Sequence, residues 1–402
     1  MATLRIKNFG AIKKADFNLN KVNLFIGYTS TGKSTAAKLL AIFNSTDVLT
    51  IPDGDFESFR QLLTEYDINF EFKEDTEIFF EQDEYFWKIG RQTLQTNNKD
   101  AELFRYSENP QIFIEQFIKQ KKDNIDFADA IKQVEAYYQQ DKKTNLLDHL
   151  YASLAELNIA SSHRIQSPIY IPAERILIST FSNSIFSLLE AGATIPQCIS
   201  RFGSLYEKAR KKRKETDIDI LNIKVNFSKE DDSITMNDQT NISLKQASSG
   251  ILSVLPLWVV LEDNSKSDSN NLILIEEPEL NLYPSVQLEL INWIMGKIVT
   301  TNNKIVITTH SPYILTAVDD LIMGQDAYSK HEQNNGIIEK LKTLLPTESL
   351  VNFSDVASYY FDKEGSVKNI RDVETRSVGA EYLDEASEKT SYIFNELSNF
   401  KK

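Results

Sequence analysis

Gly27-Tyr28-Thr29-Ser30-Thr31-Gly32-Lys33-Ser34 is the stretch that decides the fold of this 402-residue chain. Its spacing matches the phosphate-binding pattern G-x-x-x-x-G-K-[ST], whose glycines let the backbone wrap until its N–H groups point at phosphates. An apolar segment, Val22 to Ile26, precedes the stretch, and apolar residues recur at helical spacing after it. The order strand, glycine loop, helix therefore favours a nucleotide site over an ordinary glycine turn with a surface lysine.

Each residue type in this loop suits phosphate chemistry. Lys33 supplies a point charge, and the Ser34 hydroxyl can ligate Mg²⁺. The helix that follows adds the positive end of its dipole. The predicted nucleotide-binding residues are Gly27, Thr29, Ser30, Thr31, Gly32, Lys33, Ser34 and Thr35.

Two later apolar segments also end in polar residues. Leu272 to Ile275 leads into Glu276 and Glu277, and Ile305 to Thr308 leads to His310. In phosphate-loop proteins the first acid holds the metal, and the second polarises the attacking water. Because parallel sheets bind ligands at the carboxyl ends of their strands, His310 is expected to contact the γ-phosphate. A solvated acidic turn and a packed histidine are the alternatives.

Composition is typical of a globular chain, with 41% hydrophobic and 25% charged residues. The longest apolar run, Ile251 to Leu261, is far shorter than the roughly 20 residues of a membrane-spanning helix. The N-terminal residues lack an apolar signal region, and Cys198 is the single cysteine, so we expect a cytoplasmic protein without membrane contact or intrachain disulfide. The net charge of −14 argues against a surface that coats nucleic acid as a whole.

Alternating strands and helices predict an α/β fold with a largely parallel core sheet. Residues 101–160 have helical periodicity and few glycines, which predicts a helical insertion. The other expected strands are Leu4–Phe9, Ala15–Leu19, Ile68–Phe72, Glu77–Glu81, Tyr85–Ile89, Ser167–Ile171, Leu221–Phe227 and Ser233–Met236. Further helices are expected at about 176–215, 250–261 and 284–298.

The set and order of motifs resemble the ABC-type ATPase heads of the SMC, RecF and OLD families over roughly residues 1 to 320. Ala247-Ser248-Ser249-Gly250-Ile251 looks like the ABC signature, and the stretch from Glu276 to Pro284 looks like their Walker B motif and D-loop. Thr309-His310-Ser311-Pro312 resembles the switch-histidine segment. Tyr170 to Arg175 resembles a stretch of OLD-like ATPases, and its position implies a Q-loop with Glu174 in place of the glutamine.

The resemblance implies ATP and Mg²⁺ as cofactors, with Ser34 and Glu276 at the metal and Glu277 and His310 as catalytic residues. It also implies a head-to-tail dimer or a higher homo-oligomer. In such an assembly the signature residues Ser248, Ser249 and Gly250 contact the γ-phosphate held by the opposite phosphate loop. A helix that opens with these residues can bind an anion, although a serine-rich cap without a ligand is the alternative.

The resemblance further implies an ABC-ATPase head with a P-loop parallel core sheet, an antiparallel β-subdomain and a helical insertion lobe. We divide the chain on this basis into four units. They are residues 1–100 (ATPase lobe I with Walker A and the β-subdomain), 101–215 (helical insertion), 216–325 (ATPase lobe II with the signature, Walker B and the switch histidine) and 326–402 (C-terminal tail subdomain).

The tail narrows the function that the resemblance implies. Beyond His310 there is no Asp-x-Asp pair of the kind found in TOPRIM nucleases, so we expect no nuclease domain in this chain. Ala357–Phe361 and Tyr382–Glu385 resemble the C-terminal ends of stand-alone ATPases from the PARIS and Septu phage-defence systems. The first hypothesis is therefore a sensor or scaffold subunit that controls a separately encoded effector, such as a nuclease. The alternative is a DNA-repair or DNA-maintenance ATPase that acts directly on duplex DNA.

One basic cluster interrupts the acidic background. Such a run is either a solvated helix face or a site that binds anions, and the anion could belong to DNA or to a phage protein that mimics DNA. The cluster consists of Lys208, Arg210, Lys211, Lys212, Arg213 and Lys214.

Overall fold

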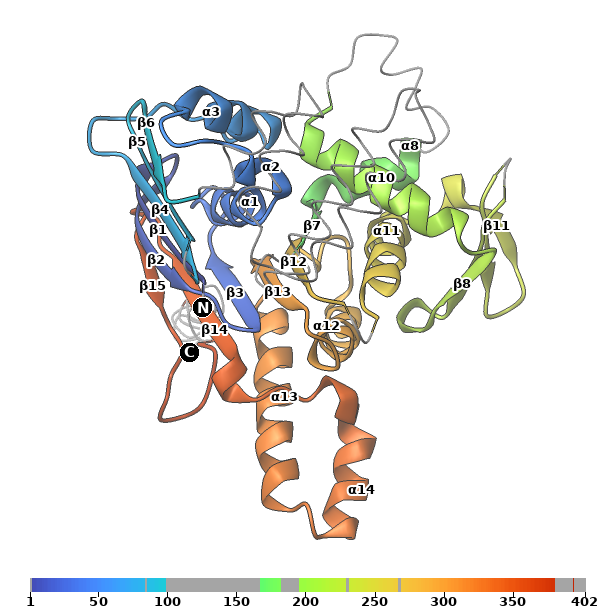
Figure 1. Ribbon diagram of the computed structural model, residues 1–402. Coiled ribbons are helices and arrows are strands. Elements are labelled where there is room, and N and C mark those ends of the chain that lie inside the picture. Colours follow the sequence, from blue (N-terminus) through green and yellow to red (C-terminus); the bar gives the residue numbers. More distant parts are fainter. Residues whose placement is uncertain are drawn as a thin grey trace, which may run out of the picture.

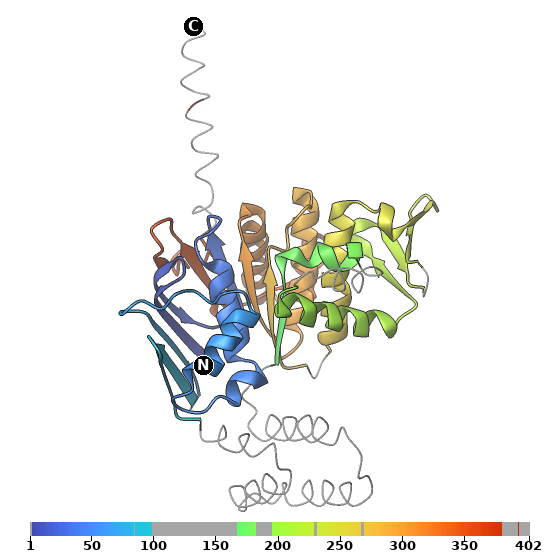
Figure 2. The ribbon, with the colours of Figure 1, turned by 90° about the horizontal axis from the view of Figure 1, so that it is seen from above.

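The computed structural model describes residues 2–83, 85–98, 167–181, 195–228, 231–266, 269–379 and 393. Figure 1 shows a strand-rich N-terminal part on the left and a helical part with a small sheet on the right. The central sheet lies between them, and Figure 2 shows the same arrangement from above.

The central sheet of the described residues is largely parallel. Its strands are β3 (Val22–Gly27), β7 (Ser167–Ile171), β12 (Asn271–Glu276), β13 (Lys304–Thr309), β14 (Val356–Phe361) and β15 (Val367–Asn369). They lie in the order β15-β14-β3-β13-β12-β7, and all neighbours are parallel except β15 with β14. Every residue of β3 and β14 is buried, as expected for parallel strands covered on both faces. The predicted α/β class is confirmed.

The N-terminal sheet is antiparallel and packs against the helix that follows the phosphate loop. It consists of β1 (Ala2–Phe9), β2 (Ile12–Asn18), β4 (Glu77–Gln82), β5 (Tyr85–Gly90) and β6 (Thr93–Thr96), in the order β2-β1-β4-β5-β6. Phe80 of β4 stacks on Phe43 of helix α1 (Lys33–Phe43), with ring centroids 4.8 Å apart. Of the strands expected in this region, those at Leu4–Phe9, Ala15–Leu19, Glu77–Glu81 and Tyr85–Ile89 are confirmed by β1, β2, β4 and β5.

Ile68–Phe72 does not form the strand that its alternation predicts. The backbone N–H of Ile68 donates to Leu63 O, and that of Phe70 donates to Ile68 O, so local turns satisfy these groups. The ring of Phe70 packs edge-on against Phe9, 5.4 Å between centroids. Since β4 already pairs with β1 and β5, no sheet edge is left for this segment there.

Helices cover the central sheet and extend from it. α1 and α10 (Gln197–Lys211) pack on β7, while α11 (Ser249–Asn264) packs on α8 (Ile176–Phe181) and α10. Figure 1 shows α13 (Pro312–Lys330) and α14 (Asn335–Leu344) projecting as a hairpin away from the sheets. The other α-helices of the described residues are α2 (Thr46–Leu49), α3 (Phe56–Glu65) and α12 (Pro284–Val299).

A small antiparallel sheet and short 3-10 turns complete the described chain. The sheet has the order β11-β10-β9-β8, and its strand β8 packs against α11. Its strands are β8 (Glu215–Ile218), β9 (Ile223–Asn226), β10 (Ser233–Met236) and β11 (Asn241–Ser243). The 3-10 helices are η2 (Ala173–Arg175), η3 (Asp219–Leu221), η4 (Leu244–Gln246), η5 (Thr347–Ser349) and η6 (Phe353–Asp355).

Three strands of the central sheet come from segments that the four-unit division placed elsewhere. β7 falls within 101–215, and β14 and β15 fall within 326–402, yet all three lie in the same sheet as β3. The helical insertion predicted for 101–160 lies outside the described residues, so the division itself stays a prediction. Among the described residues, no helix has both the length and the apolar character required to cross a bilayer.

Candidate active site

The phosphate loop connects β3 to α1 through residues in left-handed backbone conformations. Gly27 has φ 143°, Ser30 has φ 63° and Gly32 has φ 100°. A Cβ atom on Gly32 would lie 2.5 Å from Ile12 Cγ1, and one on Gly27 would collide with the carbonyl of Phe361. Only glycine fits these two positions, so the two glycines of the motif have a direct steric cause.

The loop exposes some of its polar side chains and buries others. Thr29, Ser30 and Ser34 are exposed at the loop, whereas Thr35 is buried on α1. The Thr31 hydroxyl donates to Tyr28 O at 2.8 Å and supports the loop from within. The predicted nucleotide-binding residues therefore form one continuous cradle at the N-terminus of α1.

Lys33 is buried inside this cradle. Its Nζ donates to Gly27 O at 2.9 Å and to Tyr28 O at 2.6 Å. Burial lowers the pKa of Lys33 to about 8, although Glu277 and other nearby carboxylates oppose the shift. The ammonium group is held by the carbonyls of the loop whose N–H groups would bind phosphate.

Glu276 ends β12 and is almost completely buried, with 3% of its surface exposed. Burial raises the pKa of Glu276, and the ammonium of Lys38 and the hydroxyl of Ser34 oppose that rise. Its Oε1 atom has no hydrogen-bond partner in the described part of the chain, and the same is true of Thr308 Oγ1 on β13. An orphaned buried carboxylate oxygen beside a hydroxyl fits the oxygen ligands that Mg²⁺ prefers.

Glu277 has an unusual backbone conformation, with φ 42° in the left-handed region. Its Oε1 lies 2.7 Å from His310 Nε2, and His310 Nδ1 lies 2.9 Å from Gly27 O and 3.4 Å from Lys33 Nζ. Hydrogen bonding by His310 lowers the pKa of Glu277 and outweighs the effect of burial. The two predicted catalytic residues therefore meet each other directly beside the phosphate loop.

Glu279 and Gln287 tie the switch-histidine segment to the D-loop, and the motif comparison gave neither a role. Glu279 Oε1 accepts from Thr309 Oγ1 at 2.7 Å and from the His310 N–H at 2.9 Å. Gln287 Oε1 accepts from the Ser311 hydroxyl at 2.6 Å. Their place in and after the Glu276–Pro284 stretch was a hint, but their partners lie 24 to 31 residues later in the chain.

Ser248, Ser249 and Gly250 lie at the start of α11, and Figure 1 shows α11 to the right of β7 and β12, whereas α1 lies to their left. The two serines are exposed, and no side chain caps the helix N-terminus. A Cβ atom on Gly250 would lie 2.8 Å from Asn281 O, so the first turn of α11 packs closely on the D-loop. The structure thus brings the signature to the D-loop and not to the phosphate loop of its own chain.

The predicted Q-loop residue Glu174 and its neighbour Arg175 differ in solvent exposure. The Glu174 side chain is exposed, whereas Arg175 is completely buried and donates to the backbone carbonyls of Glu276 and Glu277. Sequence reasoning named Glu174 and missed Arg175. The position of Arg175 just after β7 could have indicated a contact with the acid pair, because β7 pairs with β12, the strand that ends at Glu276.

The basic cluster is extensively paired with acids. Arg210 binds Asp232, and Arg213 binds Glu262 at 2.8 Å. Lys212 binds Asp263 at 2.7 Å, and Lys211 lies 3.5 Å from Glu207. These ion pairs reduce the positive charge that the cluster presents to an anion.

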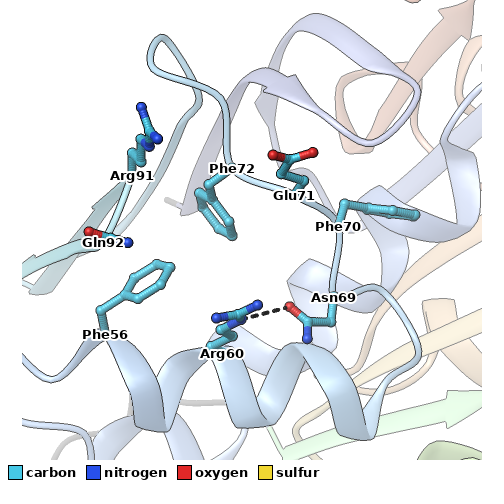
Figure 3. A pocket seen from close by; sticks show the side chains of 8 residues that line it. All are labelled: Phe56, Arg60, Asn69, Phe70, Glu71, Phe72, Arg91 and Gln92. Atoms are coloured by element: carbon cyan, nitrogen blue, oxygen red, sulfur yellow. Dashed lines mark hydrogen bonds between the residues drawn. The ribbon is translucent and has the colours of Figure 1, made fainter.

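A cavity of about 320 Å³ lies away from the phosphate loop, between α3, the segment 69–72 and the β5–β6 turn. Figure 3 shows that Phe56 and Phe72 line it with Arg60 and Arg91 around them. The Arg60 side chain donates to Asn69, and Arg91 pairs with Glu74. No residue of the predicted site lines this cavity.

A phosphate loop, an acid pair and a histidine on one edge of a parallel sheet define a phosphate-loop nucleoside triphosphatase. Residues 1–315 match the model of the family described as AAA ATPase domain, and the chain belongs to this family. The predicted ATPase class is thereby confirmed. No curated protein matches the chain.

Solved structures of SMC heads are similar to this chain. The SMC head domain from Thermotoga maritima is 11% identical, with 78% of this chain and 90% of that chain covered and a TM-score of 0.37. The Smc head domain from Pyrococcus furiosus, bound to the C-terminal domain of ScpA, is 12% identical, with 79% and 92% covered and a TM-score of 0.35.

Proposed function

We propose that this chain hydrolyses ATP and that its heads associate through ATP held between them. The observation that carries the proposal is the convergence of Glu277, His310 and Lys33. His310 contacts both of the others: its Nε2 lies 2.7 Å from the Glu277 carboxylate, and its Nδ1 lies 3.4 Å from the Lys33 ammonium. A base, its orienting group and a cation at one point are the parts that phosphoryl transfer to water needs.

The side chains have separate roles in this mechanism. Lys33 exchanges its loop carbonyls for the phosphate chain, which the loop N–H groups also bind. Glu277, whose pKa is lowered by the hydrogen bond from His310, stays ionised and accepts the proton of the attacking water while His310 holds the carboxylate. The water oxygen bonds to the γ-phosphorus, the bond to the β–γ bridging oxygen breaks, and ADP leaves. Ser34 and Glu276 would hold Mg²⁺, which neutralises phosphate charge.

The lowered pKa of Lys33 predicts that ATP affinity falls with rising pH. Bound phosphate favours the charged amine, so ATP binding takes up a proton above pH 8, where free Lys33 is largely neutral. Affinity measured in EDTA should fall about tenfold between pH 7.5 and pH 9 if bound Lys33 regains its ordinary pKa. Calorimetry in two buffers of different ionisation enthalpy at pH 8.5 checks the proton uptake, and a pH-independent affinity would contradict the prediction.

The same pKa shift has a defined sign for stability. Because the pKa of Lys33 is lower in the folded chain than in the unfolded one, the unfolded state binds more protons between about pH 8 and pH 10.5. The contribution of Lys33 to stability therefore rises with pH through that window, while ATP affinity falls.

We further propose that each signature acts on the ATP of a neighbouring chain. The exposed, uncapped start of α11 supports this, because its free backbone N–H groups and exposed serines suit a phosphate. In Figure 1, α11 and α1 lie on opposite sides of β7 and β12, which supports action in trans. The resulting assembly is a head-to-tail dimer or a larger homo-oligomer, which ATP stabilises and hydrolysis releases.

Mixing two inactive variants tests this arrangement. Lys33→Ala removes the phosphate loop function, and Ser249→Arg blocks the signature. An equimolar mixture should recover about a quarter of the wild-type rate, because half of the random dimers are mixed and each has one intact composite site. Phosphate release by the mixture and by each variant alone is the measurement. Absence of recovery in a mixture that forms dimers would contradict action in trans.

We propose that the biological role is that of a sensor or scaffold subunit in bacterial phage defence, with a separately encoded effector as partner. The tail resemblance supports this role, and the ion pairs of Arg210, Lys212 and Arg213 weaken the case for direct binding to duplex DNA. Co-purification with the products of neighbouring genes tests it. Steeply salt-dependent binding to plain DNA that is lost on neutralising residues 211–213 would favour a DNA-maintenance ATPase instead.

A further inference from the structure

Arg175 is a buried charge at the centre of the candidate site. It ends η2, directly after β7, and none of its surface is exposed. A guanidinium has five N–H donors, and all five have a backbone carbonyl as acceptor here. Nε donates to Ser253 O at 3.0 Å, Nη1 to Pro172 O at 3.1 Å and Glu276 O at 2.7 Å, and Nη2 to Glu277 O at 2.8 Å and Pro278 O at 3.3 Å.

Three of these carbonyls are consecutive and span the catalytic acid. Glu276 O, Glu277 O and Pro278 O lie on both sides of the left-handed Glu277 backbone. Residues with a side chain rarely adopt this conformation, and it persists only where the surroundings hold it. Arg175 supplies such a hold, since rotation of either peptide next to Glu277 would break a hydrogen bond to its guanidinium.

The Ser253 carbonyl connects Arg175, and through it the Glu277 turn, to the signature helix α11. Ser253 lies in the first turns of α11, three residues before Pro256. The Ser253 carbonyl accepts from Arg175 Nε there. One side chain thus joins the end of β7, the start of α11 and the turn that carries Glu277.

We propose that Arg175 is a positioning residue for hydrolysis, which holds the Glu277 backbone so that its carboxylate stays on His310 beside the phosphate loop. The inference rests on the proposed ATP hydrolysis. All five Arg175 donors are bonded to carbonyls, so none remains for phosphate. Loss of the Arg175 guanidinium should therefore slow the chemical step. Nucleotide binding should stay intact, because the phosphate loop makes the binding contacts.

Arg175→Lys tests the proposal, with Arg175→Gln as a second variant. Lysine keeps the charge, but its three donors on one atom cannot span five carbonyls. We expect kcat for ATP to fall about 100-fold, as for a catalytic group displaced by an ångström, while Kd for a fluorescent ATP analogue stays within about twofold. Arg201→Lys is the matched control, because Arg201 pairs with Asp47 and Glu65 away from the acid pair, and its kcat should not change.

A double-mutant cycle separates positioning from a general structural role. If Arg175 acts through the Glu277 carboxylate, then Arg175→Lys in a Glu277→Gln background should lower kcat by no more than about twofold. Effects that multiply in the double variant would overturn the proposal. So would a kcat near that of the wild type, or a Kd that rises in step with the loss of kcat.

Separate control experiments test the folding of the variants and the proposed function. Circular dichroism and a melting curve accompany each variant, and failure of both Arg175 variants to fold would also overturn the proposal, since Arg175 would then be a residue of the fold alone. If the proposed function is wrong, the wild-type chain itself releases no phosphate from ATP. That result is read from the wild-type assay and does not depend on any Arg175 variant.

Discussion

Lys33→Ala abolishes ATP binding in practice, with a loss of affinity of at least about 100-fold. A hydrogen bond to a charged group contributes roughly 1.5–3 kcal/mol, and Lys33 also supplies the cation at the centre of the phosphate cradle. The fold should survive, because the lysine is buried at a cost that its lowered pKa reflects. Equilibrium titration with a fluorescent ATP analogue gives the affinity, and the melting temperature reports the fold.

Lys21→Ala is the matched control for this variant. Lys21 immediately precedes β3, whereas Lys33 follows the carboxyl end of that strand, so the two lie at opposite ends of β3. Lys21 Nζ donates to Val299 O and Thr301 O, both at 2.9 Å, and these bonds serve only the fold. Lys21→Ala should therefore bind ATP as the wild type does. Equal affinity of Lys33→Ala and wild type would show that the loop is not the nucleotide site.

Glu277→Gln should lower kcat by about 10²–10⁴-fold, the usual contribution of a general base, while ATP still binds. Glutamine has the same shape, and its amide oxygen can still accept from His310 Nε2, but it cannot take a proton from water. ATP-bound oligomers should therefore accumulate with Mg²⁺. Phosphate release measures turnover, and gel filtration with and without ATP measures assembly.

Glu289→Gln is the control for the loss of one carboxylate. Glu289 is exposed on α12 and belongs to no part of the site, so its turnover should match that of the wild type. Wild-type turnover in Glu277→Gln would remove Glu277 from the mechanism. Loss of ATP binding together with turnover would instead make Glu277 a binding residue.

Local patterns predicted most of the elements that carry the site. β3, the phosphate loop and α1 follow directly from eight residues and their apolar flanks, and β12 and β13 end at the predicted acids and histidine. The prediction failed at Ile68–Phe72, where the alternation was real. A strand needs a neighbouring strand with free backbone groups as well as a pattern, and β4 is already paired on both sides.

Long-range contacts of charged residues were beyond such patterns. The run Lys208 to Lys214 looked like one basic surface, but acids from Asp232, Glu262 and Asp263 neutralise much of it. The motif that supplied Glu174 contained Arg175 as well. Both are charged residues in one turn, and only burial separates the exposed side chain from the one that binds five carbonyls.

The sequence by itself determined the chemistry of the phosphate loop, the acid pair and the strand ends that carry them, because short spacings encode each one. Only the tertiary structure decided what holds Glu277 in place. The bonds from Arg175 to Ser253, Glu276, Glu277 and Pro278 join residues 78 to 103 positions apart. Such contacts depend on which strands become neighbours in the sheet, and no local periodicity encodes that choice.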